Sequence, residues 1–160
     1  MVSPWEPAGR ASHASGEGRL RVYVMLNSGT FSADMMNVPE NRMPDDVLVV
    51  EDDPIIALDF EDTISGFGVK TVRAAATVAR ALKMIEERAP DFALLDVGLM
   101  REKSFAVAER LDELGIPFAF VTGYGAEVKL PAAFKDRPRL PKPCASDALE
   151  AVLRGYRAGR

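Results

Sequence analysis

The chain has 160 residues, 48% of them hydrophobic, which is enough for one domain with a packed core and requires no second domain. Its formal net charge of -4 gives no electrostatic footprint for nucleic acid, and its single cysteine, Cys144, excludes an intramolecular disulfide. No apolar stretch approaches the ~20 residues that cross a bilayer, and no signal-peptide pattern is present, so we expect a cytoplasmic protein.

Residues 1–44 differ in composition from the rest of the chain. They are rich in Ser, Gly and Pro, and their apolar residues are concentrated in a patch at 20–26. That patch has strand-like residues but no neighbouring strand with which to pair. We therefore expect 1–44 to be a disordered leader or the product of an early start codon, with Met36 and Met43 as alternative starts, and 45–160 to form the domain.

From residue 45 onward, short apolar runs alternate with amphipathic segments. The runs are apolar throughout, which is typical of strands buried on both faces, and they predict strands at 47–50, 69–72, 91–96, 118–121 and 139–140. Apolar residues at helical spacing predict helices across 56–67, 78–85, 107–114 and 149–156. This alternation predicts a five-stranded parallel sheet with helices on both faces.

Several boundary residues support this assignment. Asp53 precedes Pro54 and is the expected N-cap of the first helix, and Ser146 is the expected cap of the last. The connection at 122–138 contains two glycines and Pro131, with too few apolar residues to define a helical stripe. We expect a short or frayed fourth helix there, or a mobile loop.

Polar side chains follow the carboxyl ends of four expected strands. Glu51 and Asp52 follow the first strand, Asp96 ends the third, Thr122 follows the fourth and Lys142 follows the fifth. Ligands of open parallel sheets bind outside the carboxyl ends of the strands, so these side chains are expected to converge. An aspartate at that edge can act as a nucleophile toward phosphorus, with the lysine ammonium and the threonine hydroxyl contacting phosphoryl oxygens.

The carboxylates at this edge favour a hard divalent cation, because acids held close together repel one another and need compensation. We expect Asp52 and Asp96 to ligate Mg²⁺ directly and Glu51 to reach it through a water. The backbone carbonyl of Gly98 is a further candidate ligand. Each of these residues also has an ordinary reading as a cap, turn or surface residue, but their combination at consecutive strand ends favours a site.

Four short motifs carry a resemblance to a known family: Glu51-Asp52, Leu-Leu-Asp96, Phe-Val-Thr122-Gly and Lys142-Pro143. Residues 46–157 resemble a receiver domain of two-component response regulators. The resemblance implies a flavodoxin-like (βα)5 fold with strand order 2-1-3-4-5 and a cis peptide before Pro143. It also implies that Asp96 accepts a phosphoryl group, with Mg²⁺, from a sensor histidine kinase or a histidine phosphotransfer protein. Output would then pass to a downstream protein partner.

Two features depart from the common receiver pattern. The segment 99–103 replaces the Met-Pro and Gly that most receivers carry, and Arg139 stands where an aromatic switch residue is common. The Phe-Val-Thr122-Gly motif is instead similar to the Phe-Ala-Thr-Gly signature of a stand-alone alphaproteobacterial subgroup. We therefore assign part of the switching role to Tyr124 or Lys103.

Two other functions fit part of the pattern. A Mg²⁺-dependent phosphatase with an aspartyl-phosphate intermediate usually needs a second Asp two residues after the nucleophile, where this chain has Gly98. A pseudo-receiver would act only as a protein-binding module, and the retention of all the expected site residues argues against it.

Overall fold

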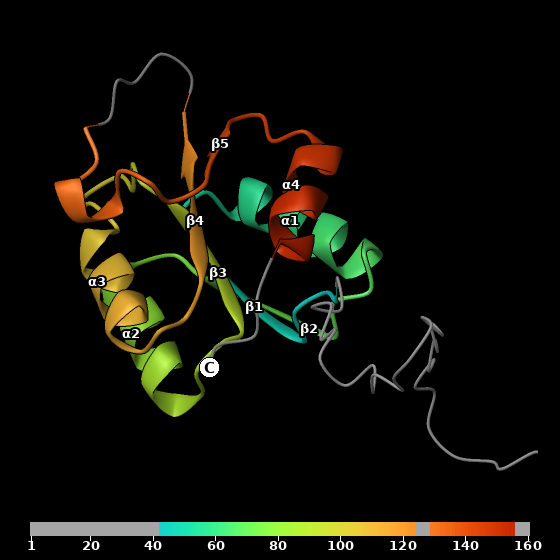
Figure 1. Ribbon diagram of the computed structural model, residues 1–160, viewed down its shortest axis with the longest axis horizontal. Helices are drawn as coiled ribbons and strands as arrows, with labels where there is room; N and C mark the ends of the chain where they lie inside the picture. The colour runs from blue at the N-terminus through green and yellow to red at the C-terminus, as the bar shows by residue number, and fades with distance from the viewer. Residues whose placement is uncertain (1–41, 124–128, 156–160) are drawn as a thin grey trace, which may run out of the picture. The chain divides into compact units, whose positions relative to one another are not determined.

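The computed structural model describes residues 42–123 and 129–155, which form a doubly wound α/β fold (Figure 1). Its parallel sheet has the strand order β2-β1-β3-β4-β5, as predicted. The strands are β1 (Asp46–Val50), β2 (Thr71–Ala75), β3 (Phe92–Asp96), β4 (Phe118–Thr122) and β5 (Arg139–Pro141). The helices are α1 (Pro54–Gly66), α2 (Val78–Glu87), α3 (Phe105–Glu113) and α4 (Ser146–Arg154), with a 3-10 turn, η2 (Ala132–Phe134), before β5.

The sheet separates two hydrophobic clusters because successive side chains of each strand point to opposite faces. Leu48 and Val50 of β1 contribute to the cluster under α2 and α3, whereas Val47 and Val49 contribute to the cluster under α1 and α4. Figure 1 shows the same division, with α2 and α3 on one side of the sheet and α1 and α4 on the other. The continuous apolar runs of the strands are explained by this burial on both faces.

The boundaries of β2 were predicted wrongly. The strand covers Thr71–Ala75 rather than 69–72, because the Thr71 amide donates to the Asp45 carbonyl at 2.9 Å and the ladder with β1 continues to Ala75. Arg73 interrupts the apolar pattern, so the pattern did not predict a strand that continues through this residue. Its guanidinium pairs with Asp46 at 2.9 Å and donates to the carbonyls of Met84 and Arg88 at the end of α2.

The predicted helix caps have different outcomes. The Asp53 carboxylate accepts hydrogen bonds from the Ile55 and Ile56 amides at 2.8 and 3.3 Å, which confirms it as the cap of α1. Ser146 is not a cap, because α4 begins one residue earlier than expected: the Leu149 amide bonds to the carbonyl of Ala145, which is the N-cap. Ser146 is therefore the first residue inside the helix.

The described part of the β4–β5 connection, residues 123 and 129–138, contains one short helical element, η2. Its Phe134 is buried and packs edge-on against Phe118, with ring centroids 5.7 Å apart. This agrees with the expected weak fourth helix. Tyr124 and residues 1–41 lie outside the described ranges, so the expectations for them stay predictions. Among the described helices, none has the length and apolar character needed to span a membrane.

Candidate functional site

Three side chains from three strand ends meet at the carboxyl edge of the sheet. The Lys142 ammonium donates to Glu51 Oε2 at 2.5 Å and to Asp96 Oδ2 at 2.7 Å. The two carboxylate side chains are only 2% and 8% exposed, and the lysine side chain is 19% exposed. The predicted convergence of these residues is therefore observed.

Backbone amides hold both carboxylates in place. Glu51 Oε1 accepts a hydrogen bond from the Asp53 amide at 3.2 Å, where the chain turns into α1. Asp96 Oδ1 accepts one from the Gly98 amide at 2.9 Å. Each acid thus has one oxygen on an amide and the other on the lysine, which fixes its orientation.

The charges of the site depend on the balance between burial and pairing. Burial raises the pKa of Glu51, while hydrogen bonds from Lys142 and the Asp53 amide oppose the rise. Burial lowers the pKa of Lys142, but its hydrogen bonds to Asp96 and Glu51 outweigh this effect and leave the pKa above its ordinary value. Lys142 is therefore charged at neutral pH and compensates the two acids beside it.

The acidic residues fit a hard divalent cation. Glu51, Asp52 and Asp96 each offer one oxygen, and these oxygens lie within 4.8 Å of one another. Carboxylate oxygens are the protein ligands that Mg²⁺ prefers. The Gly98 amide donates a hydrogen bond to Asp96. Gly98 lies beside the acidic cluster, since a Cβ at this position would stand 3.9 Å from Asp96 Oδ1.

Thr122 and Lys142 are neighbours on adjacent strand ends. The Thr122 carbonyl accepts a hydrogen bond from the Lys142 amide at 2.8 Å, and Thr122 itself is half-buried. The peptide between Lys142 and Pro143 is cis, as the family resemblance implied. Lys103 pairs through its backbone with Gly98, and its side chain is exposed.

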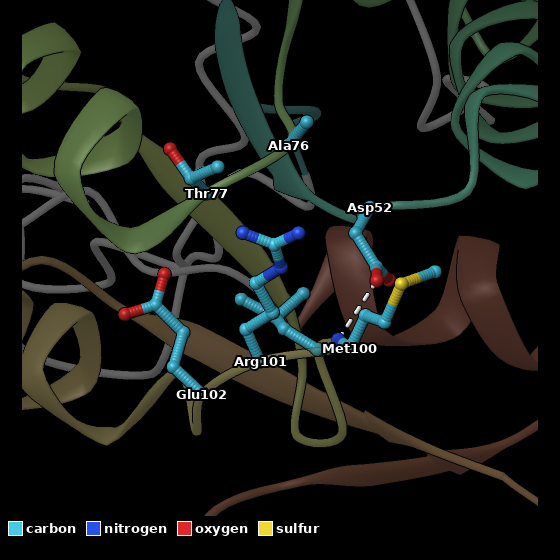
Figure 2. A pocket seen from close by; sticks show the side chains of 7 residues that line it. Asp52, Ala76, Thr77, Met100, Arg101 and Glu102 are labelled. Atoms are coloured by element: carbon cyan, nitrogen blue, oxygen red, sulfur yellow. Dashed lines mark hydrogen bonds between the residues drawn. The ribbon is translucent and has the colours of Figure 1, made fainter.

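The sequence analysis singled out the loop between β3 and α3 for its departure from the receiver pattern, but it did not predict that this loop contacts Asp52. The Met100 amide donates to Asp52 Oδ2 at 2.8 Å. Beside it lies a pocket of about 220 Å³, and Figure 2 shows Arg101 extending from the loop toward the turn before α2. The pocket is lined by Asp52, Ala76, Thr77, Leu99, Met100, Arg101 and Glu102. The only sequence signal for this loop is its departure from the usual receiver residues.

A five-stranded parallel sheet with paired acids, a further aspartate and a lysine at its carboxyl edge defines a receiver-type signalling domain. Residues 47–154 match the family model of the response regulator receiver domain. The chain belongs to that family.

Individual relatives agree with this assignment. The solution structure of SdrG from Sphingomonas melonis Fr1 is 40% identical, with a TM-score of 0.62, and the match covers 69% of this chain and 94% of that one. A second structure, the BeF3-activated conformation of SdrG, is 38% identical with a TM-score of 0.59 and covers 70% and 96% of the two chains. The phyllosphere-induced regulator PhyR of Methylorubrum extorquens is 33% identical over 85 residues, which are 51% of this chain and 32% of that protein. The chain thus matches about a third of the length of PhyR.

Proposed function

We propose that the protein is a response regulator receiver that accepts a phosphoryl group on Asp96 in an Mg²⁺-dependent phosphorelay. The observation that carries this proposal is the contact of Lys142 with both Asp96 and Glu51, at 2.7 and 2.5 Å. It places a charged ammonium beside the one carboxylate that ends a central strand. A phosphoryl group attached to Asp96 would develop its negative charge next to that ammonium.

The chemistry expected at Asp96 is an in-line displacement at phosphorus. A carboxylate oxygen forms the new O–P bond while the N–P bond of a phosphorylated histidine breaks, and the imidazole nitrogen keeps the electron pair and takes up a proton. Lys142 has three ammonium donors, two of which contact the carboxylates. The third is available to a phosphoryl oxygen, and the Thr122 hydroxyl is the expected donor to another.

Glu51, Asp52 and Asp96 are the residues that would hold Mg²⁺, with the Gly98 carbonyl as a further ligand. The bound ion would neutralise charge on the transferred phosphoryl group. Support for this part of the proposal is the mutual proximity of the three carboxylates. The SdrG structure in a BeF3-activated conformation concerns that protein, and it motivates the use of beryllofluoride as a probe here.

The proposed donor is a sensor histidine kinase or a histidine phosphotransfer protein, and the proposed output is contact with a downstream protein. Lys103 and Tyr124 stay proposed auxiliaries of the switch. The rival aspartyl-phosphate phosphatase is less favoured, because position 98 carries Gly in place of the general acid. A pseudo-receiver would share the fold and would fail to take up a phosphoryl group.

The proposal is tested by labelling the full chain with acetyl phosphate and Mg²⁺, followed by intact mass measurement and mapping of the modified residue. We expect Asp96→Asn to abolish the label. Asp59→Asn, which changes an exposed carboxylate on α1, is the matched control and should label normally. Label at another residue in Asp96→Asn would contradict the assignment. An unlabelled wild type that also ignores beryllofluoride would support the pseudo-receiver.

A further inference from the structure

The β3–α3 loop is attached to two other parts of the molecule through residues two positions apart. The Met100 amide donates to Asp52 Oδ2 at 2.8 Å, and Glu102 Oε1 accepts from the Val78 amide at 3.0 Å. An antiparallel bridge between Gly98 and Lys103 closes the loop around these residues. Figure 2 shows the Asp52 contact and the side of the pocket on which Glu102 lies.

The contact of Glu102 ends at the N-terminus of α2. The first amides of a helix have no partner within the helix. The α2 cap, Thr77, accepts from the Arg80 amide at 3.2 Å, whereas the Val78 amide is satisfied by Glu102 from a loop 24 residues further along the chain. A carboxylate is also the favoured charge at a helix N-terminus. Glu102 therefore has a defined position, and it restrains the loop that carries Met100.

We propose that Glu102 is a positioning residue for Asp52, acting through the loop and the Met100 amide. This inference rests on the proposed Mg²⁺ site. The amide orders one oxygen of the Asp52 carboxylate before a cation binds, which reduces the ordering cost of binding. Residues that orient metal ligands contribute to metal affinity although they do not touch the ion.

A second consequence is reciprocal coupling. If Glu102 affects the affinity of the acidic cluster for Mg²⁺, occupation of the cluster affects the Glu102 contact to the same extent. Addition of Mg²⁺ is therefore expected to slow hydrogen exchange at the Val78 and Met100 amides together. The Met100 amide is bonded to Asp52 itself, so its response alone is a local effect of the ion. The Val78 amide contacts Glu102 on another element, so slower exchange at Val78 is the response that reports coupling through the loop.

The test compares Mg²⁺ binding by the full chain and by three variants. Binding is measured from amide chemical shifts and by calorimetry. Glu102→Ala should weaken binding by about tenfold, at the lower end of the range for groups that orient ligands. Glu102→Gln keeps the acceptor oxygen and should retain most of the affinity. Thr77→Ala removes the other cap contact of α2 and leaves the loop intact, so it should match the wild type in Mg²⁺ affinity.

Each outcome has a distinct meaning. Equal weakening in Glu102→Ala and Glu102→Gln would show an effect of net charge and overturn the inference. Equal weakening of Mg²⁺ binding in Glu102→Ala and Thr77→Ala would show a general loss of α2 stability and would also overturn the inference. Wild-type affinity in Glu102→Ala overturns the inference alone and leaves the proposed function standing. A wild type without saturable Mg²⁺ binding overturns both.

Discussion

Replacement of Lys142 by Met tests the charge compensation at the carboxyl edge most directly. The Lys142→Met variant keeps a flexible apolar stem and removes the ammonium that lies within 2.7 Å of both Glu51 and Asp96. The two carboxylates then lose their shared partner while they stay almost entirely buried. We expect a clear loss of stability in the absence of Mg²⁺.

The size of this loss follows from the contacts. Breaking a buried ion pair by removing one partner costs about 3–5 kcal/mol. Lys142 is 19% exposed, and each acid keeps one amide hydrogen bond, from Asp53 or from Gly98. We therefore expect a decrease of about 2–3 kcal/mol in the free energy of unfolding, below that range. For a domain of this size, the corresponding fall in Tm is roughly 10 °C.

The loss should depend on pH in a defined direction. Burial already raises the pKa of Glu51, and removal of the lysine takes away a group that lowers it. A carboxyl group whose pKa is raised in the folded state favours folding below its unfolded pKa, about 4.3 for Glu, and this contribution is lost as pH rises through the folded pKa. The difference between Lys142→Met and wild type should therefore be smallest in mild acid and largest at neutral pH.

Thermal and urea unfolding of the full chain in mild acid and at neutral pH, with EDTA or with Mg²⁺, measures these effects. Mg²⁺ should restore part of the stability of Lys142→Met, because a cation at the acidic cluster replaces the missing charge. Lys70→Met is the matched control: Lys70 pairs with Asp45 on the surface, where such pairs contribute about 0–1 kcal/mol. A loss independent of pH and unaffected by Mg²⁺ would refute the reasoning.

Three further predictions concern other parts of the chain. A chain that begins at Met43 should keep the Tm and the acetyl phosphate labelling of the full chain, since all five strands of the described sheet come from residues 46–141; a substantial loss of Tm would assign 1–42 a structural role. Phe134→Ala should lower the free energy of unfolding by about 3–5 kcal/mol in urea titrations, because Phe134 is 2% exposed among aromatic rings, and a change under 1 kcal/mol would show that η2 is not an anchor. Gly68→Ala should cost about 1–2 kcal/mol in the same assay because Gly68 has φ of 91°, and an unchanged midpoint would argue against that conformation.

The topology and most of the site were predictable because both depend on local patterns. Strands that are apolar throughout can be recognised from the sequence alone, and a parallel sheet places their carboxyl ends at one edge. That rule was sufficient to predict that Glu51, Asp96 and Lys142 lie close together. The same rule did not predict the bounds of β2, because Arg73 makes the strand partly polar. Its partners, Asp46 and carbonyls of α2, are distant in the sequence and cannot be found from the residues around Arg73.

The loop contacts were not predictable for a related reason. Asp52 and Met100 are 48 residues apart, and Val78 and Glu102 are 24 apart. No periodicity or spacing links such pairs, and each residue taken alone has an ordinary interpretation as a surface or helix residue. The cap of α4 was predicted wrongly because the helix begins with a backbone contact, from the Leu149 amide to the Ala145 carbonyl. No hydrogen bond to the Ser146 hydroxyl caps it.

The burial of β1 and β3 on both faces also has a consequence for folding specificity. A strand that is polar on one face resists a one-residue slip, because the slip would bury its polar side chains. In β3, every residue from Phe92 to Leu95 is apolar, so this resistance is absent along the strand itself. Asp96 supplies it at the end, since a slip toward the core would carry the carboxylate away from Lys142 and leave it buried without a partner. The charged residues proposed for signalling therefore also specify the register in which the central strands pair.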